Sequence, residues 1–235
     1  MSYLNVASGS VVANLPGEAR AGFIRRTYAH VAGAIAALAI VEALILQAGL
    51  GASLLQFLGT GTMNYLIYLG LFIGASIVAD RWAHSDKSRE MQYLGLGLYV
   101  VVQAVILAPA MHLASLYAPT AIVDAAIATA ALVTGLTYVC FTTKKDFSFL
   151  GPIIAIASFV AIGLCVAGAV FGFNLGVVFA GAIVVLAGAS VLYSTSNILN
   201  HYQEHQHVGA ALGLFASVAL MFRFMLQIFM SFGDD

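Results

Sequence analysis

The chain has 235 residues, of which 62% are hydrophobic and 8% are charged, and its formal net charge is −1. Soluble domains contain about 25% charged residues, and a soluble fold with so few charges would expose large apolar surfaces and aggregate. The composition therefore excludes an ordinary soluble protein and predicts an all-α, polytopic membrane protein. No basic tract suggests a nucleic acid partner.

Residues 1–22 precede the first apolar run, and we predict that they form a mobile cytoplasmic N-terminal tail. They lack the basic and apolar regions of a signal peptide, and Asn14, Pro16 and Gly17 interrupt any helix there. Such a tail is either a disordered terminus or a handle for a protease or another partner. Residues 23–235 are assigned to a single transmembrane domain.

Seven apolar runs follow the tail, each close to the roughly 20 residues that cross the hydrocarbon layer of a membrane. They cover residues 28–47, 62–82, 91–112, 120–141, 150–172, 175–199 and 208–232. The division between the fifth and sixth runs is the weakest, because only a turn around Phe173 and Asn174 separates them. The sequence therefore predicts a bundle of seven transmembrane helices.

Basic residues lie at one end of this predicted bundle. They are Arg20, Arg25, Arg26, Arg81, Lys87, Arg89, Lys144 and Lys145. The connections at the other end contain neither lysine nor arginine, and Arg223 lies within the seventh run. Because cytoplasmic connections are enriched in basic residues, we expect a cytoplasmic N-terminus and an external C-terminus.

Small residues in the spans predict how the helices pack. Glycine pairs spaced by four residues allow helix backbones to approach closely in a membrane. Such pairs are Gly70 with Gly74, Gly168 with Gly172, and Gly209 with Gly213. Cys140 and Cys165 both lie in apolar runs, so we expect them to be packing residues rather than a disulfide or a metal pair.

The connection between the fourth and fifth runs has the most specific sequence in the chain. Residues 142–151 read TTKKDFSFLG and include Lys144, Lys145 and Asp146. Together with residues 138–141, this segment resembles the Bax inhibitor-1 family, especially its bacterial branch typified by YccA. Residues 188–198 are similar to the sixth-helix segment of that branch, and residues 23–28 are similar to the start of the family's first helix.

This resemblance implies a seven-helix bundle in the bacterial inner membrane, with the last helix central and surrounded by the other six. It implies no established enzymatic activity, no catalytic residue and no cofactor. Some members of the family are described as proton-sensitive calcium leak pathways. The YccA branch is known for binding and restraining the membrane protease FtsH through its N-terminal tail.

The chain departs from the calcium-leak members at their paired carboxylates. Those members carry one carboxylate late in the sixth helix and another in the seventh, where the two share a proton and can hold calcium. Here the sixth-helix position corresponds to Ser194, and residues 208–233 contain neither Asp nor Glu. A carboxylate latch of the family's type therefore cannot form from these two helices.

Other polar residues lie within the predicted spans, where an ionisable group is costly and is normally paired. Counting 1.5 Å per residue places Glu42 and Arg223 at similar depths, which predicts an ion pair between them. Asp124 and Gln227 are candidate neighbours of this pair, and Gln103 is a candidate for lining a pathway. The pair could act as a gate or ion-binding site, or it could lock the helices in register.

Two functions remain open from the sequence. The first is modulation of a membrane partner, such as an FtsH-like protease, and the free tail together with the missing carboxylates favours it. The second is a pH-sensitive cation leak through an atypical site that includes Glu42, Asp124 and Arg223; an arginine in a pore repels calcium unless Glu42 neutralises it. The string His201-x-x-Glu204-His205 matches one metalloprotease motif but falls in a short connection, so we expect no metal site.

Overall fold

The computed structural model describes residues 11–85, 88–143 and 145–232. In chain order these residues form η1 (Val12–Asn14), α1 (Gly17–Gln47), α2 (Leu50–Gly59), α3 (Thr62–Ala83), α4 (Arg89–Tyr117), α5 (Pro119–Thr143), α6 (Leu150–Phe171), α7 (Gly176–Asn200), η2 (Glu204–Gln206) and α8 (His207–Phe232). Seven of these helices, all α-helices except α2, are long and apolar enough to cross a membrane. The prediction of an all-α, polytopic membrane protein is therefore confirmed.

Helix boundaries follow local sequence signals. The Ser88 hydroxyl caps α4 by accepting a hydrogen bond from the Met91 N–H at 3.2 Å. Gly49 separates α1 from α2, and Gly172 ends α6; their φ angles of 73° and 75° are left-handed values that glycine adopts without strain. The break at Gly172 separates the fifth span from the sixth, as predicted.

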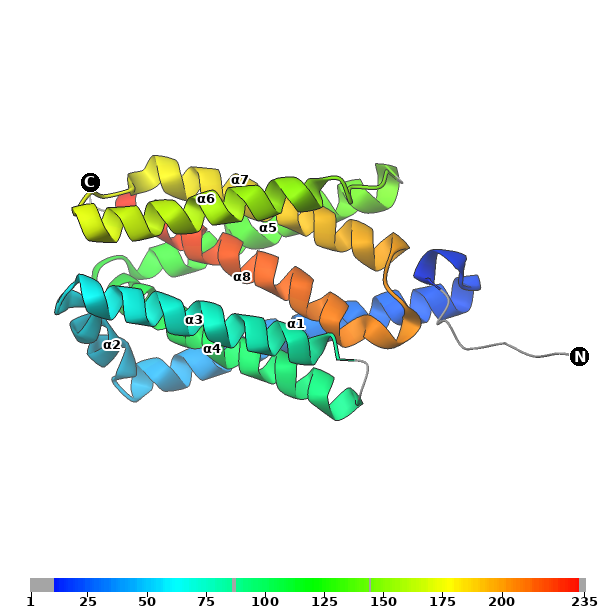
Figure 1. The fold of residues 1–235 in the computed structure, drawn as a ribbon, viewed down its shortest axis with the longest axis horizontal. Helices are drawn as coiled ribbons and strands as arrows, with labels where there is room; N and C mark the ends of the chain where they lie inside the picture. Colours follow the sequence, from blue (N-terminus) through cyan, green and yellow to red (C-terminus); the bar gives the residue numbers. More distant parts are fainter. Residues whose placement is uncertain (1–10, 86–87, 144, 233–235) are drawn as a thin grey trace, which may run out of the picture.

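Helix α2 is not predicted by the apolar pattern, because it is too short to span a membrane. It links α1 to α3 at the end of the bundle away from the N-terminus (Figure 1). Gly51 lets it approach α4 closely, since an added methyl group would lie 3.0 Å from the His112 Cβ and 3.3 Å from the Ala108 carbonyl oxygen. The helix therefore packs across this end of the bundle.

Helix α8 runs through the middle of the bundle and contacts α1, α3, α4, α5 and α7 (Figure 1). Each of the three buried apolar clusters contains residues of α8, for example Phe215, Leu214 and Leu226 respectively. Helix α6 instead packs on α7 and α3 and has no buried residue. The last helix is therefore central, as predicted, whereas α6 lies at the periphery of the bundle.

The connections gather at two ends, which we call the basic end and the opposite end. The basic end contains residues 11–16, 84–85, 145–149 and 200–206, whereas the opposite end contains residues 48–61 and 172–175 (Figure 1). Described basic residues at or near the basic end are Arg20, Arg25, Arg26, Arg81, Arg89 and Lys145. Lys87 and Lys144 lie outside the described residues.

Close backbone contacts occur at some of the predicted glycines and not at others. A methyl group on Gly209 would lie 3.1 Å from the Ala83 carbonyl oxygen, so α8 and α3 approach closely there. Gly70 and Gly74 face open space, and the prediction is wrong for that pair. The closest approach is at Gly95 of α4, where an added methyl would lie 2.4 Å from the Ala83 nitrogen.

Residues 11–22 are part of the folded bundle, so the prediction of a mobile tail is wrong for them. Val12 is fully buried, and its N–H donates to the Tyr202 carbonyl at 2.9 Å. Helix α1 begins at Gly17, directly after Pro16, because a proline at a helix start costs no hydrogen bond. Residues 1–10 lie outside the described residues.

Candidate functional site

A proline interrupts the hydrogen bonding in the middle of α4. Pro109 has no N–H, so the carbonyl of Val105, four residues earlier, lacks its helical donor. The Tyr68 hydroxyl of α3 donates to this carbonyl at 2.8 Å. The Arg223 guanidinium of α8 donates to the next carbonyl, that of Ile106, at 3.2 Å. Tyr68 thus satisfies the carbonyl that the proline leaves without a donor, as a membrane interior requires, and Arg223 adds a hydrogen bond at the neighbouring carbonyl.

Glu42 lies on the face of α1 that packs into the bundle, on the same stripe as Leu38 and Ile45. Its side chain is 3% exposed, and neither carboxylate oxygen has a hydrogen-bond partner. Leu38 and Ile45 belong to the same buried cluster as Ala108 of α4, so Glu42 faces the region around the interrupted helix. An ionised carboxylate here would cost several kcal/mol unless a proton or a cation neutralised it.

The predicted ion pair between Glu42 and Arg223 does not form in the described part of the chain. The ion pairs observed there join Arg26 with Glu204, His84 with Asp80, and His201 with Asp146. Arg223 instead bonds the Ile106 carbonyl and lies 5.9 Å from the centre of the Phe224 ring. Residue counting gives the depth of a side chain but not the direction in which its helix presents it, and α4 offers a backbone acceptor that the pattern did not reveal.

The other predicted neighbours of this pair are dispersed. Asp124 is exposed on α5 and is not part of the buried region. Gln103 is buried in α4, where its side-chain amide donates to the Tyr99 hydroxyl at 3.0 Å. Gln227 lies one turn beyond Arg223 and lines the same crevice. Of the candidates, the structure therefore brings only Gln227 to Arg223.

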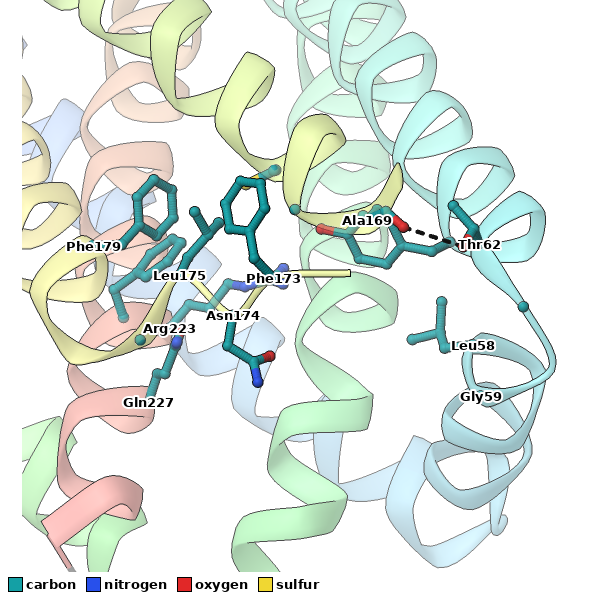
Figure 2. A pocket seen from close by; sticks show the side chains of 16 residues that line it. Leu58, Gly59, Thr62, Ala169, Phe173, Asn174, Leu175, Phe179, Arg223 and Gln227 are labelled. Atoms are coloured by element: carbon teal, nitrogen blue, oxygen red, sulfur yellow. Dashed lines mark hydrogen bonds between the residues drawn. The ribbon is translucent and has the colours of Figure 1, made fainter. Parts of the chain in front are cut away.

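This crevice opens at the opposite end of the bundle and has a volume of about 660 Å³. Helices α3, α6, α7 and α8 contribute its walls (Figure 2). The Thr62 hydroxyl donates to the Ala169 carbonyl at 3.1 Å and so joins α3 to α6 at its edge. The Arg223 side chain extends from α8 toward Phe173 and Asn174 of the α6–α7 connection (Figure 2). None of the lining residues, all of them described, is acidic.

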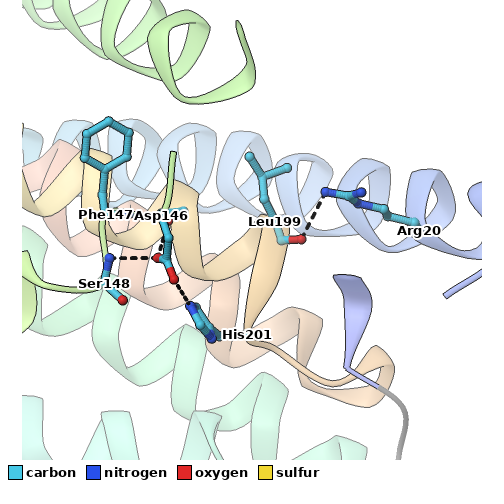
Figure 3. Close-up of polar contacts among 7 residues, drawn as sticks. Arg20, Asp146, Phe147, Ser148, Leu199 and His201 are labelled. Carbon is cyan, nitrogen blue, oxygen red and sulfur yellow. Dashed lines mark hydrogen bonds and ion pairs between the residues drawn. The ribbon is translucent and has the colours of Figure 1, made fainter. Parts of the chain in front are cut away.

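At the basic end, Asp146 ties the α5–α6 connection to the end of α7 (Figure 3). Its carboxylate accepts hydrogen bonds from the Ser148 N–H at 2.9 Å and the Ser196 hydroxyl at 3.1 Å, and it pairs with His201 at 3.0 Å. The Ser196 hydroxyl also accepts a bond from the Phe147 N–H at 2.9 Å. The donors, the Ser148 N–H first among them, lower the pKa of Asp146 to about 2.

The remaining predicted positions have simpler surroundings. Lys145 is exposed, and Lys144 lies outside the described residues. Ser194 is half-buried on α7 and faces α8, where a methyl group on Gly213 would lie 3.8 Å from both the Ser194 and Tyr202 hydroxyl oxygens. Hydroxyl groups of two side chains therefore lie beside Gly213 of α8.

Sequence reasoning did not single out Tyr68, Pro109 or Ser196, and it left His201 in a solvated turn. A proline inside a long apolar run was the available signal for the interrupted helix. No signal could have joined His201 to Asp146, because 55 positions separate them in the chain. Within the described residues, no group of three or more His, Cys, Asp or Glu side chains is placed to hold a metal ion.

Comparison with known proteins extends the similarity over nearly the whole chain. The family model described as Bax1-I, inhibitor of apoptosis-promoting Bax1, matches residues 20–234. Protein LIFEGUARD 4 and protein LIFEGUARD 3 of Arabidopsis thaliana are 27% identical over 227 residues and 24% identical over 216 residues, and each alignment covers 90% of this chain and 85% of the relative. An uncharacterized protein of Pseudomonas aeruginosa is 34% identical over 117 residues, which are 48% of this chain and 52% of that protein.

Proposed function

The chain belongs to the Bax inhibitor-1 family, whose model matches residues 20–234, and from this membership we propose that it conducts a pH-sensitive cation leak past Glu42. The observation that carries the proposal is the buried Glu42 carboxyl group, neither of whose oxygens has a partner. Such a group is stable when it holds a proton or a cation. The proposal involves no enzymatic step and no cofactor.

The interrupted segment of α4 supplies further oxygen ligands for the proposed pathway. Calcium binds carboxylate and backbone carbonyl oxygens. The Val105 and Ile106 carbonyls are occupied by Tyr68 and Arg223 in the described state. Withdrawal of the Arg223 guanidinium from Ile106 would leave the second lone pair of that carbonyl open to a cation and would remove a positive charge that repels cations. Arg223 therefore acts in this proposal as the gate of a closed state.

Protons and cations compete for Glu42 in this scheme. The other charged or titratable groups in the region include Tyr65 and Tyr68 of α3 and Arg223 of α8, whereas Asp124 of α5 is exposed. A cation needs the ionised carboxylate, so protonation of Glu42 removes the binding group. The leak should therefore decrease as the pH falls on the side from which the cation enters.

Calcium flux into liposomes at two pH values tests the proposal. Purified protein is reconstituted into liposomes that contain a calcium-sensitive dye. The rate of calcium uptake, followed by the dye signal, is compared for the parent chain, Glu42→Gln and Asp124→Asn. The Glu42→Gln variant should lose both the leak and its pH dependence. The Asp124→Asn variant makes the same chemical change at an exposed site and should behave like the parent. Equal flux through all three proteins would exclude Glu42 from the pathway.

A second candidate function is modulation of a membrane partner, such as an FtsH-like protease, at the basic end. The supporting observation is that Val12 and Asp146 are both bonded to the segment that follows α7, at Tyr202 and His201 respectively. A partner would meet this preformed surface rather than a free tail. Co-purification with such a protease should survive deletion of residues 1–10 but be lost after Val12→Asp, which disrupts the packed segment. If co-purification were lost only after deletion of residues 1–10, the protease would recognise those residues instead of the preformed surface.

We also propose that the basic end faces the cytoplasm of a bacterial cell and that the crevice opens outside the inner membrane. The gathering of basic residues at one end supports this orientation through the positive-inside rule. A reporter enzyme that is active only in the cytoplasm, fused before residue 1, should be active. An inactive reporter combined with an active C-terminal fusion would reverse the assignment.

A further inference from the structure

We propose that the crevice at the opposite end binds one anionic group, a phosphate or a carboxylate, through the guanidinium of Arg223. This inference concerns a ligand site that shares Arg223 with the proposed pathway but does not require Glu42. It starts from the charge of Arg223. All residues that line the crevice are described by the structure, and Arg223 is the only basic one among them.

The charge of Arg223 is poorly compensated within the described chain. Its guanidinium offers several N–H donors, yet it makes one hydrogen bond, from Nη1 to the Ile106 carbonyl at 3.2 Å. The Phe224 ring, 5.9 Å away, gives a weak cation–π contact. No carboxylate lines the crevice to neutralise the charge. A half-buried guanidinium with unused donors is suited to bind a phosphate or carboxylate with two parallel hydrogen bonds.

The crevice also has the shape and lining for such a ligand. Its volume of about 660 Å³ leaves room for a headgroup beside Arg223. The side chains of Asn174 and Gln227 also line the crevice and carry amide N–H groups that can donate to a ligand (Figure 2). Phe173 and Phe179 form apolar walls that can contact the uncharged part of an amphipathic molecule (Figure 2).

The position of the crevice favours a lipid as the source of the anion. It lies at the connection between two spans, α6 and α7, which is the level at which a spanning helix meets the lipid headgroups. Helix α6 is peripheral, and Phe171 at its end is 78% exposed, so lipid can reach this edge directly. A free phosphate or carboxylate from solution would satisfy the same guanidinium.

Native mass spectrometry of the full-length protein tests the proposal. The delipidated protein is mixed with phosphatidylglycerol, with oleate, or with diacylglycerol, which lacks an anionic group, and inorganic phosphate is tested separately by thermal shift. The parent chain should bind one phosphatidylglycerol or oleate molecule and should bind diacylglycerol at least tenfold more weakly. Stabilisation by inorganic phosphate alone would assign the site to a soluble anion instead of a lipid.

Four variants distinguish binding at this crevice from general lipid binding. Arg223→Gln should weaken binding of the anion about tenfold, and Arg223→Lys should retain part of it. Gln227→Phe keeps the charge but fills the crevice, so it should also lose the bound molecule. Arg81→Gln, a change of charge at the basic end, should leave binding intact. Unchanged binding in both Arg223→Gln and Gln227→Phe would overturn the proposal.

The Glu42→Gln variant keeps this test distinct from that of the leak. It should bind the anion like the parent chain even if it conducts no calcium. Loss of the leak with retained anion binding supports both proposals, whereas anion binding that disappears in Glu42→Gln would contradict the claim that anion binding does not require Glu42.

Discussion

Replacement of Glu42 by leucine should stabilise the folded protein. Both carboxyl oxygens are buried without a partner, and an unsatisfied buried polar group costs about 1–3 kcal/mol. Leucine is similar in size and continues the apolar stripe of Leu38 and Ile45 on α1. We therefore expect the free energy of unfolding of Glu42→Leu to rise by about 2 kcal/mol.

Thermal unfolding in detergent, followed by the fluorescence of Trp82, the single tryptophan, measures this change. For a chain of this length, the expected gain corresponds to an unfolding temperature roughly 4–8 °C higher. Glu42→Gln keeps polar atoms in the same place and should shift the temperature much less. Asp124→Leu provides a matched control, because it makes the same substitution at an exposed position.

The direction of the shift decides whether the reasoning is correct. A lower unfolding temperature for Glu42→Leu would mean that the carboxyl group has a stabilising partner, and it would refute the interpretation of Glu42 as an unsatisfied group. A higher temperature combined with a lost calcium leak would instead show that the group is retained for function at a cost in stability.

Removal of the Tyr68 hydroxyl should destabilise the fold, because Tyr68→Phe leaves the Val105 carbonyl without a donor; thermal unfolding should show a loss of about 1–2 kcal/mol. Acidification should loosen the α5–α6 connection. The folded-state pKa of Asp146 is lowered from 3.8 to about 2, so its contribution is present above pH 4 and disappears as the pH falls toward 2, which hydrogen exchange of residues 145–149 measures. A membrane-impermeant maleimide should label Cys165, which lines the crevice, but not Cys140, which is 2% exposed.

Each of these predictions has a matched control and a contradicting outcome. Tyr138→Phe removes an exposed hydroxyl and should leave the unfolding temperature unchanged, and an equal loss in both tyrosine variants would contradict the role of Tyr68. Asp146→Asn should abolish the acid-dependent change in the hydrogen exchange of residues 145–149. If the change persists in this variant, another titrating group causes it. Labelling of Cys140 ahead of Cys165 would contradict the open crevice.

The number and position of the spans were predictable from the sequence because they depend on composition. Each span is an unbroken apolar run, and hydrocarbon accepts such a run only as a helix whose backbone groups bond one another. The Gly172 turn and the basic end are local signals of the same kind. The family resemblance was carried mainly by the connection at residues 142–151, with support from residues 188–198 and 23–28, and it is confirmed by the match over residues 20–234.

The candidate site was predicted only in part. Depth along a helix follows from residue counting, so Arg223 and Glu42 were recognised as costly groups inside the membrane. Their partners depend on which way each helix faces, and the Ile106 carbonyl replaced the expected carboxylate. The Asp146–His201 pair was also missed, because tertiary packing brings together two connections that are distant in the chain.

By itself, the sequence determined that this protein has seven helices able to cross a membrane, with every lysine and arginine except Arg223 near one end and without a carboxylate among residues 208–232. Tertiary structure alone decided that α8 contacts five other spans, that Val12 is buried, and that Glu42 has no partner. The physical reason is the distance along the chain over which each effect acts. Apolar length and charge act residue by residue along the chain, whereas the rotation of a helix is set by side chains on several neighbouring helices at once.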